Sequence, residues 1–285
     1  RRMVNELAGT QAQFTYDEFD NLVSATYTQR GDAAAATVYR VPDKLGNLFS
    51  TASRKDRVYG KGGRLLECPD YYYHYDGEGN LIFKEFKHNH NAAAEDKQAY
   101  TKANKITPKG SRTGWSYEWK ANGLLHSVVT PAGGEIVFSY DPLGRRIAKV
   151  NKRKQQVTRW LWDDKVPLHE WQYSGDYPPH LGAGADGDLQ LEAEQVENLV
   201  TWVFEDNSFI PCAKLTAEAS YSIVTDHLGT PTHAYDVSGN KVWERELDCY
   251  GKVRQLHGDK TFCNYLYQGQ YVDEETGLAY NRFRY

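Results

Sequence analysis

The sequence predicts an all-β fold in which an array of Tyr-Asp repeat hairpins forms a curved, spiralling sheet. Two observations carry this prediction: a short motif recurs along the chain, and the composition favours strands. The motif starts with Tyr-Asp, runs through two variable residues, and ends with a turn residue followed by Asn or Arg. Its four full copies begin at Tyr16, Tyr75, Tyr140 and Tyr235.

Each copy has the chemistry of a type I turn that closes a hairpin with a bulge. The first turn position holds an acceptor carboxylate, supplied in the four copies by Asp17, Asp76, Asp141 and Asp236. The fourth position favours a positive φ, and it holds Gly79, Gly144 and Gly239 in three copies and Asp20 in the first. We expect the four repeat tyrosines to pack beside these turns.

Weaker copies lie between the full ones, at 43–48, 119–125 and 226–229, with irregular spacing. An ordinary β-rich domain with similar turns by chance is the alternative. The flanks of the first copy alternate as strands do, entering at 14–16 and leaving at 22–27. Repetition of the whole pattern favours the hairpin array over chance.

The composition agrees with strands and excludes several classes of protein. Among the 285 residues are 21 Tyr, 10 Phe and 7 Trp but a single Met, and aromatic residues favour strands. The net charge of −4 indicates no nucleic-acid partner. No apolar run reaches the roughly 18 residues of a membrane span, and the start does not resemble a signal peptide. The four cysteines, Cys68, Cys212, Cys249 and Cys263, form no CxxC pair, so we expect no zinc site and no cofactor.

Five segments follow from the pattern. Hairpins are expected over 1–86 and 114–173, and a polar insertion over 87–113, with a short helix at 92–104. An acidic, Gly/Pro-rich loop is expected over 174–198, with a short helical turn at 189–196. Strands return over 199–285. Because both ends resemble interrupted strands, we expect the chain to be a segment of a longer polypeptide.

Several residues invite a chemical reading beside a structural one. The repeat aspartates would need to converge to form a catalytic dyad, whereas their turn context explains them fully. Asp226-His227 suggests acid–base chemistry, but no Ser or Cys nucleophile motif accompanies the pair, which favours a structural role. His88 and His90 would need a third ligand to hold a metal, so a solvated loop is favoured.

Two further groups of residues are also ambiguous. The basic stretch between Arg145 and Arg159 fits a solvated hairpin better than a nucleic-acid surface, which needs a broader basic face. Trp160, Trp162 and Trp202 are expected in the core, although exposed aromatic rings on a strand surface would suit sugar binding. Neither group predicts an enzyme.

Two longer strings in the last quarter resemble a known family. The first is DHLGTP, which contains Asp226, His227, Gly229 and Pro231. The second runs from Tyr267 to Tyr285 as YQGQYVDEETGLAYNRFRY and contains Gly269 and Gly277. With the Tyr-Asp repeats, they closely resemble the core of Rhs/YD-repeat proteins, the bacterial polymorphic toxins related to the C components of insecticidal Tc toxins and, more distantly, to teneurins.

This resemblance implies a structural role. In the family, strand ribbons wind into a hollow shell that encloses a C-terminal toxin until delivery, often through a type VI secretion system. The resemblance implies synthesis in the bacterial cytoplasm followed by secretion or delivery to a target cell. The implied partners are the rest of the shell, the toxin, and secretion-system spike or chaperone proteins, with no nucleic acid and no membrane span. The family's self-cleavage aspartates are expected after Tyr285, so no enzyme is expected within the chain.

Two alternatives remain at this point. The first is a cell-surface adhesin of the same repeats that binds carbohydrate or protein, and it predicts clusters of exposed Trp and Tyr. The second is the aspartyl self-cleavage machinery, which predicts activity only together with a segment that follows residue 285.

Overall fold

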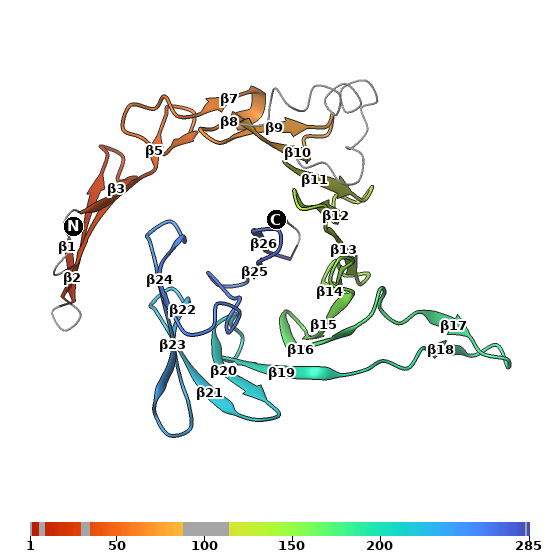
Figure 1. Ribbon diagram of the computed structural model, residues 1–285. Coiled ribbons are helices and arrows are strands. Elements are labelled where there is room, and N and C mark those ends of the chain that lie inside the picture. Colours follow the sequence, from red (N-terminus) through yellow and green to blue (C-terminus); the bar gives the residue numbers. More distant parts are fainter. Residues whose placement is uncertain (1, 6–8, 30–34, 88–113, 283) are drawn as a thin grey trace.

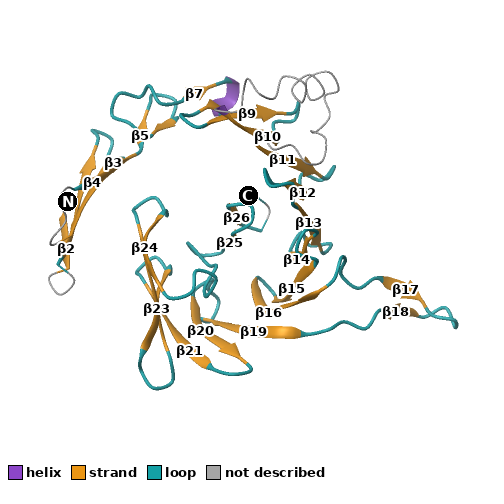
Figure 2. Cartoon of the chain, in the orientation of Figure 1, coloured by secondary structure: helices purple, strands orange, loops and turns teal. Residues whose placement is uncertain are grey.

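The computed structural model describes residues 2–5, 9–29, 35–87, 114–282 and 284–285. Their regular structure is β throughout, apart from one turn of 3-10 helix at Lys61–Gly63. Figure 2 shows this dominance of strands and loops. The predicted all-β fold class is therefore confirmed.

The chain begins with a four-stranded antiparallel sheet. Its strands are β1 (Arg2–Asn5), β2 (Thr10–Tyr16), β3 (Leu22–Gln29) and β4 (Ala36–Tyr39), paired in sequence order. A short pair then follows, made by β5 (Val41–Pro42) and β6 (Leu48–Phe49). The first full repeat forms the turn between β2 and β3.

A second sheet of 16 strands contains most of the remaining chain as one antiparallel meander. Strands that are neighbours in the sheet are neighbours in sequence, except where a separate hairpin lies between β16 and β19. The strands are β7 (Val58–Tyr59), β8 (Leu65–Glu67), β9 (Tyr71–Tyr75), β10 (Leu81–Phe86), β11 (Gly114–Trp119), β12 (Leu125–Val129), β13 (Glu135–Tyr140), β14 (Arg146–Asn151), β15 (Gln156–Asp163), β16 (Val166–Ser174), β19 (Glu197–Phe204), β20 (Pro211–Thr216), β21 (Ser220–Thr225), β22 (Pro231–Tyr235), β23 (Lys241–Leu247) and β24 (Val253–His257). The three predicted hairpin segments thus all contribute strands to one sheet.

The ribbon of strands curls so that its end comes back toward its beginning, as Figure 1 shows. The backbone N–H of Cys249 donates to the hydroxyl of Tyr27 at 2.7 Å. The hydroxyl of Tyr250 donates to the carbonyl of Leu22 at 3.1 Å. These bonds join β3 to the turn between β23 and β24, so the described strands complete about one turn of a spiral.

The last part of the chain that the structure describes, residues 258–282 with 284–285, leaves the sheet after β24 and lies on its concave side (Figure 1). We call it the inner segment. It contains the small hairpin of β25 (Tyr271–Asp273) and β26 (Leu278–Tyr280). Three buried tryptophans of the sheet share a core with its rings, and that core contains Trp160, Trp202, Trp243, Tyr265 and Tyr271. A second core lies under Leu278 and Tyr285 and contains Tyr117, Leu125, Val128, Ile136 and Phe138.

Two predictions concern insertions. The predicted helix at 92–104, together with His88 and His90, lies outside the described residues. The predicted loop at 174–198 is wrong in part, because it contains a hairpin of β17 (Leu181–Ala183) and β18 (Leu189–Leu191). The helical turn expected at 189–196 is absent there, since Leu189 and Leu191 alternate with period two and pair with Ala183 and Leu181.

Candidate functional site on the concave face

Each repeat turn is closed by its aspartate. In the first copy, Asp17 Oδ1 accepts the backbone N–H groups of Phe19 and Asn21, both at 2.9 Å, and Asn21 Nδ2 donates to Asp17 Oδ2 at 3.0 Å. The hydrogen bond from the Asn21 side chain lowers the pKa of Asp17. Asp76 and Asp236 repeat this arrangement with Asn80 and Asn240. These contacts explain why Asn recurs at this position of the repeat.

The copy at Asp141 uses Arg145 in place of Asn. Arg145 Nε donates to Asp141 Oδ2 at 2.6 Å, and the backbone N–H of Arg145 donates to Oδ1 at 2.9 Å. Partial burial opposes the charge of Asp141, but these bonds outweigh it and lower the pKa of Asp141. The motif therefore ends in Asn or Arg because both side chains donate to the same carboxylate oxygen.

The repeat tyrosines lie in different surroundings. The hydroxyls of Tyr75 and Tyr140 donate to the carbonyls of Leu65 and Leu125 at 2.9 and 2.8 Å, which ties each hairpin to the preceding one. Tyr235 is half-buried, with its ring stacked beside that of His233. Tyr16 is exposed.

A bulge beside the third turn redirects one strand. Tyr140 pairs with Arg146, whereas the preceding Ser139 pairs with Ala148, so β14 contains one extra residue at this point. Such a bulge shifts the alternation of side chains between the two faces. Arg146 and Lys149, three positions apart, consequently both reach the concave face and the inner segment.

Four charged side chains form a buried ion cluster where they meet that segment. Arg146 donates to Asp273 Oδ2, and Lys149 Nζ lies 3.3 Å from Asp273 Oδ1 and 3.0 Å from Glu275 Oε2. Asp273 is 0% exposed, and Arg146 is 1% exposed. Burial opposes the charge of Lys149, but Asp273 and Glu275 outweigh it and raise the pKa of Lys149. The prediction that the basic stretch forms a solvated hairpin is therefore wrong for Arg146 and Lys149, because the inner segment covers both side chains.

Aromatic rings surround the guanidinium of Arg146. Its central carbon lies 4.4 Å from the ring centre of Trp160 and 4.5 Å from that of Tyr280. The backbone N–H of Arg146 donates to the hydroxyl of Tyr280 at 2.8 Å, and Trp162 Nε1 donates to the Arg146 carbonyl, also at 2.8 Å. Cation–π contacts gain strength in such a desolvated site. Arg146 thus holds the inner segment by charge, by stacking and by its backbone.

A protonation-sensitive contact lies beside this cluster. The hydroxyl of Tyr271 donates to Glu170 Oε1 at 2.7 Å, and Asn264 Nδ2 donates to Tyr271 at 3.0 Å. Burial raises the pKa of Glu170, even though the hydrogen bond from Tyr271 and the cation of Lys149 act in the opposite direction.

Two further cations of the sheet bind backbone carbonyls of the inner segment. Lys214 Nζ donates to the carbonyl of Phe262 at 2.6 Å. Arg245 Nη1 donates to the carbonyl of Cys263 at 3.2 Å, and its Nη2 donates to the backbone carbonyls of Tyr265 and Pro231. Burial lowers the pKa of both Lys214 and Arg245. Strands β14, β20 and β23 thus each provide a cation that holds the same segment.

The two family strings meet in space. Gln268 Nε2 donates to the carbonyl of Leu228 at 2.9 Å, which joins the 226–229 turn to the inner segment. Gly229 has φ +80°, and a Cβ there would lie 2.7 Å from Ile210 Cγ1 and 2.9 Å from Gln268 Cγ. Only glycine allows this approach without displacement. Pro231 is fully buried in the following strand.

The remaining predicted positions serve turns. Asp226 Oδ1 accepts the backbone N–H groups of Leu228 and Thr230, both at 2.9 Å, while His227 is exposed. Gly269 and Gly277 have φ of +78° and +68° in two separate turns of the inner segment. The carboxylate of Asp226 is thus engaged by its own turn. Sequence reasoning considered Arg146 and Lys149 only as members of the basic stretch, and it did not identify Glu170 or Arg245.

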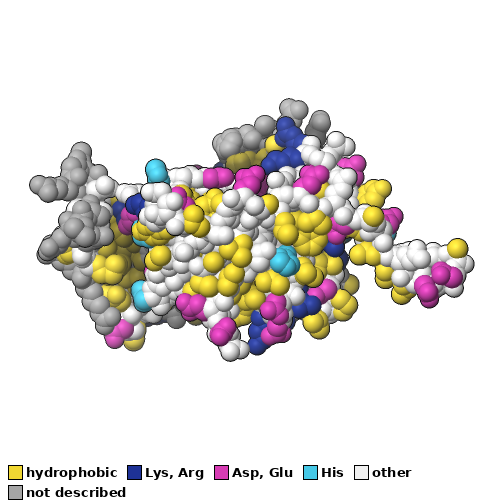
Figure 3. Space-filling view, turned by 90° about the horizontal axis from the view of Figure 1, so that it is seen from below, with side chains coloured by type: hydrophobic (Ala, Val, Ile, Leu, Met, Phe, Trp, Pro, Cys, Tyr) yellow, Lys and Arg dark blue, Asp and Glu magenta, His cyan; other side chains and the backbone are white. Residues whose placement is uncertain are grey.

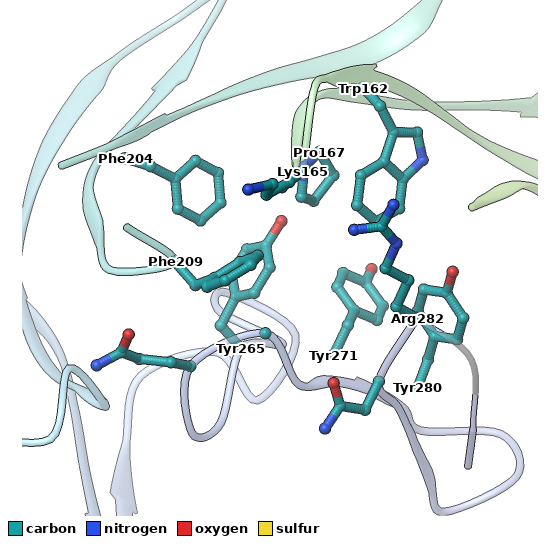
Figure 4. A pocket seen from close by; sticks show the side chains of 12 residues that line it. Trp162, Lys165, Pro167, Phe204, Phe209, Tyr265, Tyr271, Tyr280 and Arg282 are labelled. Atoms are coloured by element: carbon teal, nitrogen blue, oxygen red, sulfur yellow. The ribbon is translucent and has the colours of Figure 1, made fainter. Parts of the chain in front are cut away.

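A small pocket of about 130 Å³ opens between the inner segment and the hairpin turns of β15–β16 and β19–β20. Figure 4 shows Phe204 and Phe209 on one side and Trp162 on the other, with Tyr271 and Tyr280 below. Lys165 and Arg282 also line it. No carboxylate lines this pocket.

Other site types have little support among the described residues. They include no group of three or more His, Cys, Asp and Glu side chains that could hold a metal ion. They also include no helix of the length and apolarity needed to cross a membrane. The contacts of Arg146, Lys214 and Arg245 make the candidate site a face on which the sheet binds the inner segment.

No protein-family model matches the chain. Curated relatives nevertheless cover most of it. Double-stranded DNA deaminase toxin A of Burkholderia cenocepacia is 29% identical over 85% of this chain and 16% of its own length. The probable deoxyribonuclease RhsB of Dickeya dadantii is 25% identical over 79% of this chain and 13% of its own length. Toxin protein Tse5 of Pseudomonas aeruginosa is 26% identical over 100% of this chain and 22% of its own length. The chain thus spans less than a quarter of each.

Solved structures give a weaker similarity. A Tc holotoxin pore of Photorhabdus luminescens aligns with a TM-score of 0.44 and 15% identity, over 98% of this chain and 16% of that one. A TcdB2–TccC3 complex aligns with a TM-score of 0.42 and 15% identity, over 96% of this chain and 16% of that one.

Proposed function

Because the chain is related to the Rhs/YD-repeat polymorphic toxins, we propose that it forms part of the wall of a β-shell. The shell surrounds a toxin polypeptide and takes part in its delivery to a target cell. The chain acts without catalysis of its own. Its partners are the remainder of the shell, the toxin and components of a secretion system such as the type VI apparatus, used in competition between bacteria or in attack on a host.

The position of the inner segment carries this proposal. Residues 258–285 lie within the curl of the sheet, where the buried ion cluster fixes them (Figure 1). The hydroxyl of Tyr285 lies 2.9 Å from that of Tyr140 on the concave face. A polypeptide joined to Tyr285 would therefore start inside the curl, as the cargo of a shell must.

The adhesin alternative has less support. It predicts exposed clusters of tryptophan, yet all seven tryptophans are described and none is exposed. The exposed aromatic side chains of the described residues are Tyr16, Phe19 and Tyr177. Tyr16 and Phe19 belong to the first repeat, whereas Tyr177 lies far from both in the sequence. A stacking platform for sugars needs aromatic faces open to solvent.

Limited proteolysis of the gene product that contains this chain tests the proposal. In the wild-type protein we expect the polypeptide that follows residue 285 to resist cleavage. Asp273→Asn should expose it, because the buried ion cluster loses its shared carboxylate, and cleavage should accelerate about tenfold or more. Glu274→Gln is the matched control, since the one ion pair of Glu274 within the described residues is with the exposed Lys260, at 3.3 Å.

Two results would overturn the proposal. One is cleavage of the following polypeptide in the wild-type protein at the rate of its isolated form. The other is a gene product with no polypeptide after Tyr285 and with a membrane anchor upstream, which would support a surface-binding protein.

A further inference from the structure

A two-stranded hairpin projects from the wall and takes no part in the concave site. Strands β17 and β18 pair with each other and with no other described strand. We call residues 174–198 the arm. In Figure 1 the arm extends away from the curl, between β16 and β19. It needs an explanation because a two-stranded hairpin has little stability of its own in water.

One face of the arm is apolar and open to solvent. Leu181 pairs with Leu191, and Ala183 pairs with Leu189, so these four side chains share a face. Leu181, Leu189 and Leu191 are 62%, 72% and 59% exposed. The opposite face carries only Gly182 and Gln190. Three neighbouring leucines exposed to this extent are typical of a surface that a partner covers.

The base of the arm is held firmly. The backbone N–H of Gly175 donates to the carbonyl of Gln155 at 2.8 Å, and Arg159 Nε donates to Glu194 Oε1 at 2.7 Å. At the tip, the backbone N–H of Gly187 donates to the carbonyl of Gly184 at 3.0 Å. The arm therefore presents its leucines in a defined position instead of folding them onto the wall.

The charged side chains of the arm are all acidic. Residues 174–198 contain no Lys and no Arg, and their six carboxylates belong to Asp176, Asp186, Asp188, Glu192, Glu194 and Glu197. Figure 3 shows acidic and hydrophobic side chains on this projection, at the right of the view. Such a surface attracts a basic partner and repels another acidic one.

We propose that the arm is a docking element for a separate protein, whose surface has an apolar groove flanked by Lys and Arg. The groove would cover Leu181, Leu189 and Leu191, and the basic rim would face the carboxylates at the tip. Pairing of two arms from two copies is disfavoured because both are acidic. A bacterial lipid surface is disfavoured for the same reason, since it is anionic.

Selection from a random peptide library on the purified chain tests the chemistry of this partner. We expect the enriched peptides to be net positive and to contain large apolar residues. Their binding, measured by fluorescence anisotropy, should weaken about tenfold or more between about 50 mM and about 500 mM salt. Leu189→Ser should weaken binding about tenfold, because a buried leucine contributes roughly that much.

Matched variants separate the two parts of the surface. Gln190→Ser on the opposite face should leave binding unchanged. Asp186→Asn with Asp188→Asn should reduce the salt dependence while the leucines still bind. Circular dichroism checks that each variant keeps the fold of the wall.

Several outcomes would overturn the proposal. One is enrichment of acidic peptides, or of peptides whose binding does not depend on salt. Another is binding of the enriched peptides to Leu189→Ser as tightly as to the wild-type chain. Dimerisation that Leu189→Ser abolishes would assign the arm to a second copy. Binding to phosphatidylglycerol vesicles that Leu189→Ser abolishes would assign it to lipid.

Discussion

Removal of the charge of Asp273 tests how the concave face holds the inner segment. Asp273→Asn keeps the size of the side chain but leaves Arg146 without its carboxylate and Lys149 with Glu275 alone. Loss of one partner of a buried ion pair costs about 3–5 kcal/mol of unfolding free energy. Because Lys149 keeps Glu275, we expect the lower end, about 3 kcal/mol, which is roughly a hundredfold change in the unfolding equilibrium.

Urea denaturation followed by tryptophan fluorescence measures this change, since Trp160 lies 4.4 Å from the Arg146 guanidinium. Glu274→Gln supplies the control, and a surface pair of this kind contributes about 1 kcal/mol or less. A loss below about 1 kcal/mol for Asp273→Asn would refute the reasoning, because it would mean that the cluster is hydrated or that the segment lies elsewhere.

Three further predictions concern the turns and the buried acid. Gly229→Ala and Gly239→Ala face the same positive φ, +80° and +81°, but only the Cβ at 229 meets other atoms. We expect Gly239→Ala to lower the unfolding free energy by about 1 kcal/mol and Gly229→Ala by about 1–3 kcal/mol more, measured by urea denaturation; equal losses would contradict the packing of this turn on Gln268. The pKa of Asp76 is lowered, with its hydrogen bonds to Asn80 outweighing burial, so the unfolded state binds protons more readily. The contribution of the Asp76 carboxylate to the unfolding free energy is present above the ordinary carboxyl pKa, and it is lost as pH falls through the lower pKa of the folded state. The melting temperature of Asp76→Asn should therefore fall less between about pH 4 and about pH 2 than that of the wild type. Glu170 should affect stability in the opposite direction, because burial raises its pKa. Its contribution to the unfolding free energy is therefore lost as pH rises through the pKa of the folded state. Glu170→Gln should unfold at the same or a higher urea concentration at pH 7, and its stability should depend less on pH. Tyr271→Phe should lower the unfolding free energy by about 1–3 kcal/mol. Marked destabilisation by Glu170→Gln would contradict this reasoning, because it would show that the carboxylate is charged and paired.

The repeat made much of the fold predictable. A Tyr-Asp turn depends on residues within one short stretch, so Asp17, Asp76, Asp141 and Asp236 show their local role in the sequence itself. The alternation of apolar residues gave the strands for the same reason. The arm was harder to predict, because its leucine pattern covers only a few residues and its exposed face lacks the burial that normally distinguishes a strand.

The concave site was not predictable in this way. Arg146 reaches the inner segment because of a bulge, and its carboxylate partner lies 127 positions along the chain. A single sequence does not show which acid and which base meet over such a separation. Gly229 is intermediate: its turn was evident in the sequence, but the close approach of Gln268 depends on how the chain folds back.

A cryo-electron microscopy map of the gene product that contains this chain tests the central claim most directly. The account predicts density for residues 258–285 on the concave face, contact between Asp273 and Arg146, and a polypeptide that continues from Tyr285 into the enclosed space. A map in which this segment lies on the convex face, or in which the following polypeptide leaves directly to solvent, would contradict the account.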